Sequence, residues 1–295
     1  MVKSFDVVTF QASDGVQLNG LLSLPKSPKG VCIYVHGLTS SAFTSLGHAV
    51  TPMLNKAGYG IFILNTRGAG LVTGFKREDK RKASGFRYET FGTTFETFTD
   101  SVHDLDGAVL FLKSHKLKNI VFIGSSTGCQ KSVYYLSQRG KQRGIMGIVL
   151  LSPLSDRVVI QSELGSQFDY ALAHAKWLVN HKQKDAIMPA ELTDFMLSAQ
   201  RFVSLTDLKS EEEIFTYSNS KKPKTLESIK VPTLAVLGDK DEYNDRPVLE
   251  LVEWYENTLQ AKKKRVEWIE GADHGFTGKE KQVGAKITTW LDTIS

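Results

Sequence analysis

The chain has 295 residues, of which 41% are hydrophobic and 23% are charged, and its net charge is +5. This is the composition of a globular protein with a buried core, and it excludes collagen-like, disordered and disulfide-scaffold proteins. The small positive charge favours anionic ligands weakly and gives no reason to expect nucleic-acid binding. The two cysteines, Cys32 and Cys129, lie in apolar or helical stretches, so we expect no disulfide and a reducing compartment.

The first residues, MVKSFDVVTFQASDG, contain no apolar run of the length found in a signal peptide. No later stretch approaches 18 uninterrupted apolar residues, which is the length needed to cross a bilayer. We therefore expect a cytoplasmic protein without a membrane partner.

Eight segments read as β-strands. The first two, Phe5–Phe10 and Val16–Leu24, are joined by Asp14-Gly15, a dipeptide that suits a hairpin because it tolerates positive φ. Of the other six, the runs from Val31, Gly60 and Asn119 have the continuous apolar character of strands buried on both faces, and the remaining three continue the series. The six are VCIYVHG from Val31, GIFILNT from Gly60, NIVFIGS from Asn119, GIMGIVLLSP from Gly144, VPTLAVLGD from Val231 and RVEWIEG from Arg265.

Segments with helical spacing lie between these strands. Apolar residues recur every three to four positions within 46–54, 102–112 and 248–259. A last helix is expected after Thr277, because Glu280 three residues later completes a capping-box pattern. Alternating strands and helices predict an α/β fold, with a mostly parallel eight-stranded sheet that carries helices on both faces.

One interval interrupts this alternation. Residues 157–230 separate two predicted strands by 74 residues, which is too long for a structureless loop in a compact fold. Apolar residues at helical spacing occur at 168–178 and again at 192–196. We therefore expect residues 1–156 and 231–295 to form the core, and residues 157–230 to form a helical cap over one end of the sheet.

The strongest chemical signal is the sequence from Gly124 to Gly128, which reads G-x-S-x-G. It stands between a predicted strand and a predicted helix, where such a motif forms a sharp turn that exposes the serine hydroxyl. Ser126 is therefore the candidate nucleophile. The backbone N–H of Thr127, at the start of the helix, would point to a developing oxyanion. The alternative interpretation is an ordinary Gly/Ser turn that ends a strand.

A nucleophilic serine requires a base and a group that orients the base. Asp241 follows the strand VPTLAVL, and His274 follows the strand RVEWIE. The order Ser126, Asp241, His274 and their positions at strand ends match the order in α/β-hydrolases. Asp239 and Asp156 also follow strands and are alternative candidates for the acid.

A second oxyanion donor is expected in the turn after an earlier buried strand. The backbone N–H of Leu38 would supply it, and Gly37 would let the chain pass close to the substrate. His36 precedes these residues. We interpret it as a structural histidine.

At this point the sequence resembles the α/β-hydrolase superfamily over nearly its whole length. The segments GSSTGCQKSVYYLS, LLSPLSD, AQRFVSLTD, LGDKDEYNDRP and EGADHGFTGKE resemble a little-characterised group of serine hydrolases that includes fungal siderophore esterases. The resemblance implies cleavage of ester bonds through an acyl-enzyme, with Ser126, Asp241 and His274 as nucleophile, acid and base. Relatives commonly have histidine where this chain has Ser125.

Three other patterns carry weaker signals. The glycines at 68, 70 and 74 do not have dinucleotide-binding spacing, and no motif for a metal appears, so we predict no cofactor and no metal. The basic stretch Lys76–Lys82 is interpreted as a solvated loop, with a steering patch for anionic substrates as the alternative. Five aromatic residues follow at spacings of two to four and are expected on the face of a core helix: Phe86, Tyr88, Phe91, Phe95 and Phe98.

The sequence therefore predicts a serine esterase that acts on a small-molecule ester. Thioesterase, lactonase and peptidase activities use the same triad and remain open. A hydrolase-fold protein that binds a small molecule with little turnover is the alternative from a different class.

Overall fold

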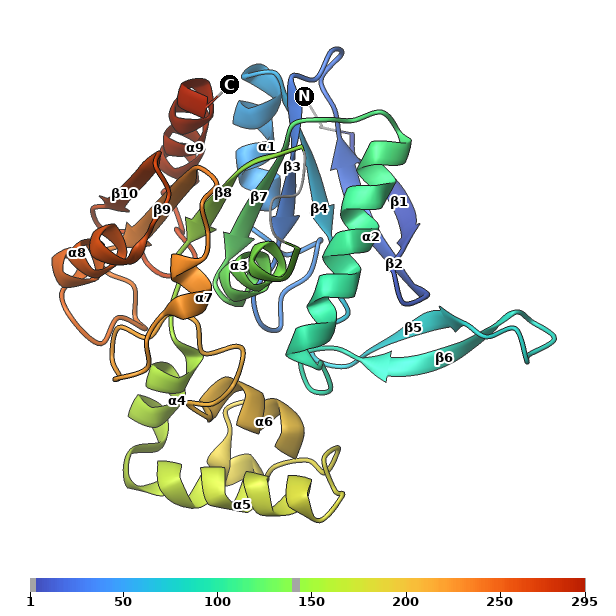
Figure 1. Ribbon diagram of the computed structural model, residues 1–295, viewed down its shortest axis with the longest axis vertical. Helices are drawn as coiled ribbons and strands as arrows, with labels where there is room; N and C mark the ends of the chain where they lie inside the picture. The colour runs from blue at the N-terminus through green and yellow to red at the C-terminus, as the bar shows by residue number, and fades with distance from the viewer. Residues whose placement is uncertain (1–3, 140–143, 295) are drawn as a thin grey trace.

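The computed structural model describes residues 4–139 and 144–294. Figure 1 shows a central twisted sheet with helices on both sides. The sheet has ten strands, not the eight predicted. They are β1 (Asp6–Gln11), β2 (Val16–Ser23), β3 (Gly30–Val35), β4 (Tyr59–Leu64), β5 (Thr73–Glu78), β6 (Phe86–Phe91), β7 (Ile120–Ser125), β8 (Ile145–Leu151), β9 (Thr233–Gly238) and β10 (Lys264–Ile269).

The sheet is mostly parallel, as predicted. Its order is β10-β9-β8-β7-β3-β4-β2-β5-β6, and β1 pairs with β2. The six strands from β10 to β4 pair in parallel, whereas the pairs that involve β1, β2, β5 and β6 are antiparallel. Every residue of β3, β4 and β9 is buried, which explains their continuous apolar sequences. Gly15, with φ +87°, forms the expected turn between β1 and β2.

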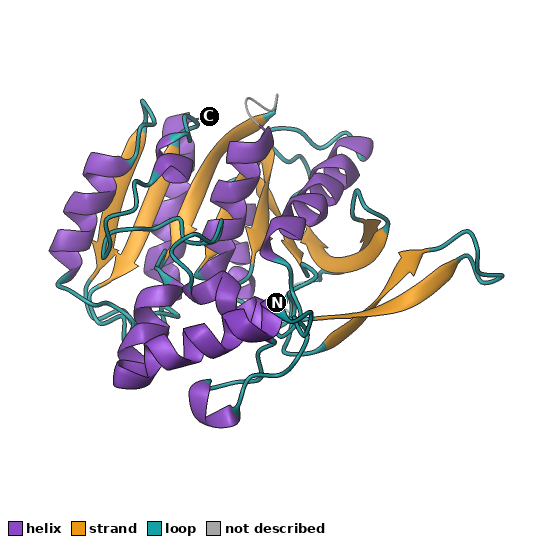
Figure 2. Ribbon diagram, turned by 60° about the horizontal axis from the view of Figure 1, so that its bottom comes forward, coloured by secondary structure: helices purple, strands orange, loops and turns teal. Residues whose placement is uncertain are grey.

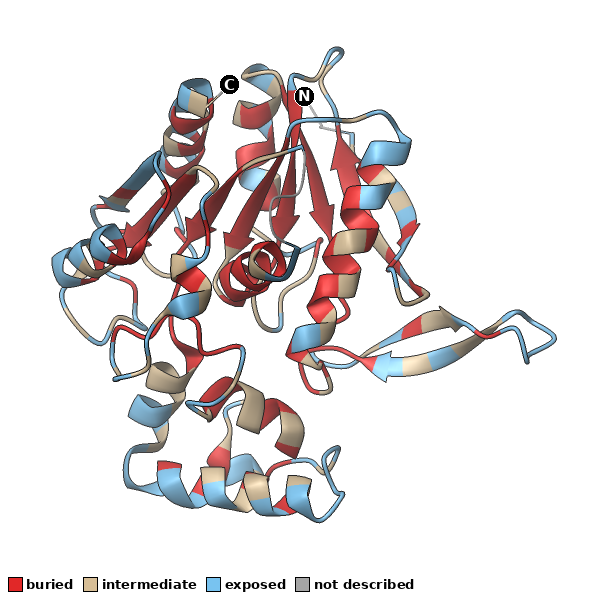
Figure 3. Cartoon of the chain, viewed as in Figure 1, coloured by how far each residue is buried: buried red, intermediate tan, exposed pale blue. Residues whose placement is uncertain are grey.

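Helices cover both faces of the sheet, and the view in Figure 2 shows both layers. The helices are α1 (Gly47–Lys56), α2 (Ser101–Ser114), α3 (Thr127–Arg139), α4 (Asp156–Leu164), α5 (Phe168–Asn180), α6 (Ala199–Thr206), α7 (Lys224–Glu227), α8 (Val248–Thr258) and α9 (Glu280–Ile294). Apolar residues of α2, α3, α7 and α8 form one core cluster with the strands. Those of α1 and α9 form a second cluster on the opposite face. In Figure 3 the buried residues are concentrated along the central strands and the helix sides that face them.

The two additional strands correct the prediction for residues 73–91. β5 and β6 form an antiparallel hairpin that projects from the sheet in Figure 1, so the aromatic residues in this region do not lie on a helix. These strands could not be recognised from the sequence, because they are rich in charged residues and few of their residues are buried. Cross-strand contacts stabilise them instead: Arg77 forms an ion pair with Glu89 at 2.6 Å, and Lys76 Nζ lies 4.3 Å from the centre of the Phe86 ring.

Residues 157–230 divide into two parts by their packing. Helices α4, α5 and α6 lie below the sheet in Figure 1, and their apolar residues form a third core cluster. The residues that follow α6 return to the core, where Phe215 and Leu226 belong to the cluster that contains α3. Of the two helical patterns predicted here, the one at 168–178 is α5. The one at 192–196 is wrong, since only a 3₁₀ turn forms beside it at Ala190–Leu192.

Two smaller observations complete the fold. Helix α9 begins at Glu280, and the Glu280 carboxylate accepts a hydrogen bond from Gly278 N–H, not from Thr277 as a capping box would require. Across residues 4–139 and 144–294, no helix is long and apolar enough to cross a lipid bilayer.

Candidate active site

Ser126 lies in the sharp turn between β7 and α3. Its φ of +54° is a left-handed conformation that residues with a side chain rarely adopt. Two backbone hydrogen bonds hold the turn, one from Ser126 N–H to the Leu151 carbonyl (2.9 Å) and one from Cys129 N–H to the Ser126 carbonyl (2.8 Å). A Cβ at Gly124 would lie 2.7 Å from Cys129 Cα, so strand and helix can approach this closely only with glycine there. The glycines of the motif therefore serve the turn that presents the hydroxyl of Ser126.

His274 lies in the loop between β10 and α9. Its Nδ1 donates a hydrogen bond to Asp241 Oδ2 at 2.8 Å, and Tyr243 N–H donates to the other carboxylate oxygen at 3.0 Å. Because the carboxylate can only accept, the proton of the imidazole is placed on Nδ1, and Nε2 has a free lone pair. The hydroxyl of Ser152 donates to the His274 carbonyl at 3.0 Å and fixes the backbone of the loop.

The two alternative acids do not contact His274. Asp239 accepts a hydrogen bond from Gly271 N–H at 2.6 Å and stabilises the turn after β10. The Asp156 carboxylate accepts from the Gln130 side chain at 2.7 Å. Of the three carboxylates considered from the sequence, the structure brings only Asp241 to the histidine.

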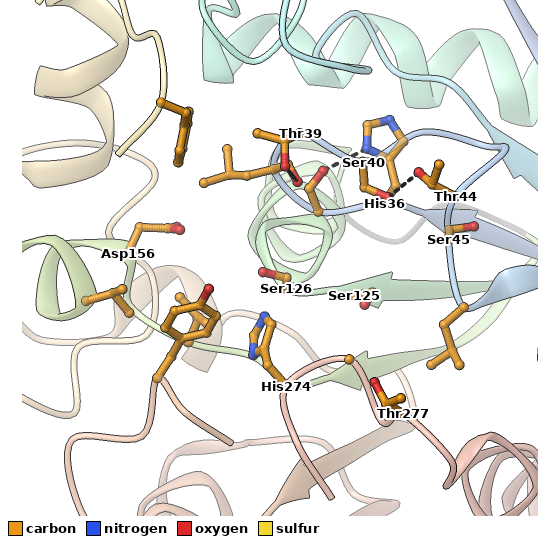
Figure 4. A pocket seen from close by; sticks show the side chains of 18 of the residues that line it. His36, Thr39, Ser40, Thr44, Ser45, Ser125, Ser126, Asp156, His274 and Thr277 are labelled. Carbon is orange, nitrogen blue, oxygen red and sulfur yellow. Dashed lines mark hydrogen bonds between the residues drawn. The ribbon is translucent and has the colours of Figure 1, made fainter. Parts of the chain in front are cut away.

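A cavity of about 700 Å³ joins these groups, and this volume is in the range found for small-molecule sites. Ser126 and His274 both line it, and Figure 4 shows the His274 ring extending toward Ser126. Among the described residues, no hydrogen bond connects these two side chains, and such catalytic bonds often form only when substrate binds. Hydroxyl-bearing residues occupy one side of Ser126 in Figure 4, and Asp156 lies on the other side.

The turn after β3 passes directly over the nucleophile. A Cβ at Gly37 would lie 2.8 Å from Ser126 Cβ and 3.3 Å from its Oγ. Neither Leu38 N–H nor Thr127 N–H has a hydrogen-bond acceptor within the described part of the chain. Both N–H groups are therefore free to donate to a ligand beside Ser126.

His36 holds this turn in place. Its Nε2 accepts a hydrogen bond from Thr66 N–H at 3.2 Å, so its Nδ1 carries the proton and donates to the Gly37 carbonyl at 2.8 Å. Burial and, to a smaller extent, the nearby Lys131 ammonium together lower the pKa of His36 to about 4. A neutral imidazole thus fixes the position of Gly37.

This pKa predicts an acid-dependent loss of stability. Between about pH 6.5, the ordinary value for histidine, and about pH 4, the unfolded chain binds a proton at His36 that the folded chain does not. The free energy of unfolding should therefore fall as the pH drops through this range, by on the order of 3 kcal/mol from this residue. Urea unfolding of the wild type and His36→Gln at both ends of the range measures the difference in pH dependence.

His181→Gln is the matched control, because His181 is exposed on the end of α5. It should retain the pH dependence of the wild type, whereas His36→Gln should show a shallower one. An equal pH dependence in the wild type and His36→Gln would contradict this account of His36.

Several residues that line the cavity were not predicted from the sequence. The ring of Tyr243 packs edge-on against the His274 ring, with 4.8 Å between their centres. Glu163 and Asp194, from residues 157–230, line the cavity with Tyr243. No local pattern marks these positions, since their association depends on how that segment folds over the sheet. Within the described residues, no cluster of His, Cys, Asp or Glu side chains could hold a metal ion.

One protein family matches most of the chain in sequence. Residues 82–292 match a family described as "Protein of unknown function (DUF1749)", and the match spans well over half of the chain. The chain belongs to the DUF1749 family. No curated protein matches the DUF1749 chain in sequence.

Solved structures with the α/β-hydrolase fold resemble the chain over almost its full length. Est1E from Butyrivibrio proteoclasticus, with ferulic acid bound, aligns with a TM-score of 0.68 and 18% identity over 97% of this chain and 99% of that one. The siderophore hydrolase EstB from Aspergillus fumigatus aligns with a TM-score of 0.68 and 17% identity over 94% and 95%. A soluble variant of monoglyceride lipase from Saccharomyces cerevisiae aligns with a TM-score of 0.68 and 14% identity over 100% and 96%. The predicted α/β-hydrolase fold is confirmed.

Proposed function

We propose that the chain is a serine hydrolase that cleaves small carboxylic esters through an acyl-enzyme. The observation that supports this proposal is the cavity that Ser126 and His274 both line. His274 Nδ1 is hydrogen-bonded to Asp241, which leaves Nε2 available for Ser126. A strained turn that exposes a serine beside a histidine with a free nitrogen is the arrangement that acyl transfer needs.

In the proposed mechanism, His274 Nε2 accepts the hydroxyl proton as Ser126 Oγ bonds to the carbonyl carbon of the ester. The N–H groups of Leu38 and Thr127 donate to the oxyanion that forms. His274 then gives its proton to the departing alcohol. Water, activated in the same way, attacks the acyl-enzyme, and the acid leaves as Ser126 regains its proton.

The part of residues 157–230 that contains α4, α5 and α6 is proposed to act as the cap of this site. Val159 and Ile160 of α4, together with Phe195, line the cavity and give it apolar wall area. The cap is tied to the core by hydrogen bonds from Ser198 N–H to the Thr94 carbonyl (3.1 Å) and from Thr94 Oγ1 to the Met196 carbonyl (2.8 Å). We expect its apolar side chains to set the preference for the acyl or alcohol group.

Covalent labelling tests the proposal. A fluorophosphonate should react with Ser126, and peptide mapping should find the label on that residue. A panel of short-chain, aromatic and siderophore-type esters, with a thioester and a lactone, then identifies the bond that is cleaved. A folded protein that neither reacts at Ser126 nor hydrolyses any of these substrates would instead be a binding protein.

Gly37→Ala should lower kcat by on the order of 10²-fold. The added methyl group overlaps Ser126, so the turn must shift and take Leu38 N–H away from the oxyanion position. The measurement is kcat and KM with the best ester of the panel.

Gly74→Ala is the control, because a Cβ at Gly74 meets nothing within 4 Å. Both variants should retain the circular dichroism spectrum of the wild type. If Gly37→Ala keeps a kcat within twofold of the control, the turn does not support an oxyanion hole.

A further inference from the structure

The cavity has an unusual distribution of charge. Four acidic residues line it, whereas none of its described lining residues is Lys or Arg. The chain as a whole has more basic than acidic residues, 37 against 32. The acidic residues of the cavity are Asp156, Glu163, Asp194 and Glu280. The formal charge of the acidic residues that line the cavity is thus opposite in sign to the net charge of the chain.

These carboxylates have no salt-bridge partner in the described part of the chain. Within the described residues, none of the four forms an ion pair with Lys, Arg or His. Partial burial raises the pKa of Glu163, and the neighbouring charge of Asp194 raises it further. The two groups therefore lie close enough to repel each other, and a cation between them would relieve that repulsion.

Asp156 is the buried member of the group. It is 8% exposed, and Figure 4 shows its carboxyl group directed into the cavity. Its hydrogen-bond partner Gln130 is neutral. Burial raises the pKa of Asp156, and the charges of Glu212 and Glu213 behind it act in the same direction, against the nearby Arg201. A bound positive charge on the cavity side would stabilise the ionised carboxylate.

Aromatic rings stand beside these carboxylates. Phe195 and Tyr243 line the same cavity, and Tyr243 contacts the ring of His274. Burial raises the pKa of Tyr243, and the charges of Glu242, Glu163, Asp241 and Asp194 raise it further. Carboxylates together with aromatic rings are a combination that binds ammonium groups.

We propose that the cap side of the cavity binds a positively charged group of the substrate, so that preferred substrates are esters with an ammonium group on the acyl or alcohol part. The cap side consists of Asp156, Ile160, Glu163, Asp194, Phe195 and Tyr243. This inference rests on the proposed ester hydrolysis. It also predicts that anionic esters are poor substrates, although the chain is basic overall.

Two pairs of substrates test the inference. Acetylcholine is compared with its neutral isostere 3,3-dimethylbutyl acetate, and Nα-acetyl-lysine methyl ester with Nα-acetyl-norleucine methyl ester. At low ionic strength the cationic member of at least one pair should have a kcat/KM about 3- to 10-fold higher. The ratio should shrink as salt is added, because the Glu163 and Asp194 carboxylates are exposed to solvent and are screened by ions. A neutral member that equals or exceeds the cationic one in both pairs overturns the inference.

Substitution of Glu163 and Asp194 tests whether these carboxylates cause the preference for cationic substrates. Glu163→Gln combined with Asp194→Asn should reduce the ratio between cationic and neutral substrate several-fold, toward one. Glu191→Gln is the matched control, because Glu191 is an exposed carboxylate of the same segment that does not line the cavity. If the double variant keeps the ratio of the wild type, the carboxylates do not determine the preference.

Binding without turnover separates this inference from the proposed function. Phenyltrimethylammonium, titrated into the wild-type protein by calorimetry, should bind, and the double variant should bind it several-fold more weakly. A protein that binds this cation without hydrolysing any ester would contradict the proposed function alone. Absence of binding to the wild type would overturn the inference.

Discussion

Ser126→Ala should lower kcat by about 10⁴- to 10⁶-fold for every ester that the wild type hydrolyses. In the proposed mechanism only the Ser126 hydroxyl forms the covalent bond to the acyl group. Without it, His274 has no hydroxyl proton to accept, and the oxyanion that Leu38 N–H and Thr127 N–H would stabilise does not form. The loss should appear in kcat and not in KM, because the walls of the cavity remain. Steady-state kinetics on the purified variant and the wild type, at equal protein concentration, measure both quantities.

Ser137→Ala provides the matched control for this experiment. Ser137 lies on the same helix, α3, and its hydroxyl bonds to the Tyr134 carbonyl outside the cavity. Its removal should leave kcat within twofold of the wild type. A Ser126→Ala protein that retains more than about a tenth of the wild-type kcat, with contaminating esterases excluded by fluorophosphonate labelling, would show that another residue is the nucleophile.

The parallel part of the sheet could be predicted largely because its inner strands are buried on both faces. Burial requires continuous apolar runs, and such runs are visible in a single sequence. The edge strand β10, in which only Val266 and Ile269 are buried, was predicted because it continues the alternation of strands and helices. Thus β3, β4, β7, β8, β9 and β10 begin within two residues of the predicted positions. The hairpin β5–β6 could not be found in this way. Apart from Phe75 and Phe91, its residues are exposed or only partly buried, and cross-strand pairs such as Arg77 with Glu89 replace apolar burial.

The candidate triad could be predicted for a related reason. Parallel strands carry their functional residues at one edge, so Ser126, Asp241 and His274 could be assigned from their positions after strands, without knowledge of contacts. The sequence favoured Asp241 and left Asp239 and Asp156 as alternatives. Asp239 and Asp156 follow strands equally well, and only the path of each loop determines which carboxylate reaches the histidine.

The contacts between the cap and the core could not be predicted from the sequence, because no local pattern indicates them. Glu96, Lys131 and Arg201 meet in a fully buried cluster, in which Glu96 lies 2.7 Å from Lys131 and 3.6 Å from Arg201. The Arg201 guanidinium also pairs with Glu212. These residues come from a loop, from α3 and from α6, and each resembles an ordinary surface charge when it is read alone. A single sequence does not show which of its distant charged residues form pairs of this kind.

Asp241→Asn should lower kcat by on the order of 10³- to 10⁴-fold while leaving the fold intact. The asparagine amide can donate to His274 Nδ1, which favours the tautomer with its proton on Nε2. That nitrogen then faces Ser126 with a proton and cannot accept another. The comparison of kcat for Asp241→Asn and the wild type, each with its thermal unfolding midpoint, measures this effect.

Asp239→Asn is the decisive comparison because it makes the same chemical change two residues away. Asp239 accepts the Gly271 N–H, so its replacement should affect the stability of the turn more than kcat. If Asp239→Asn lost as much kcat as Asp241→Asn at equal stability, the 2.8 Å contact between Asp241 and His274 would not be the catalytic one. A loss confined to Asp241→Asn, with retained fluorophosphonate access to the cavity, assigns the orientation of the base to this single carboxylate.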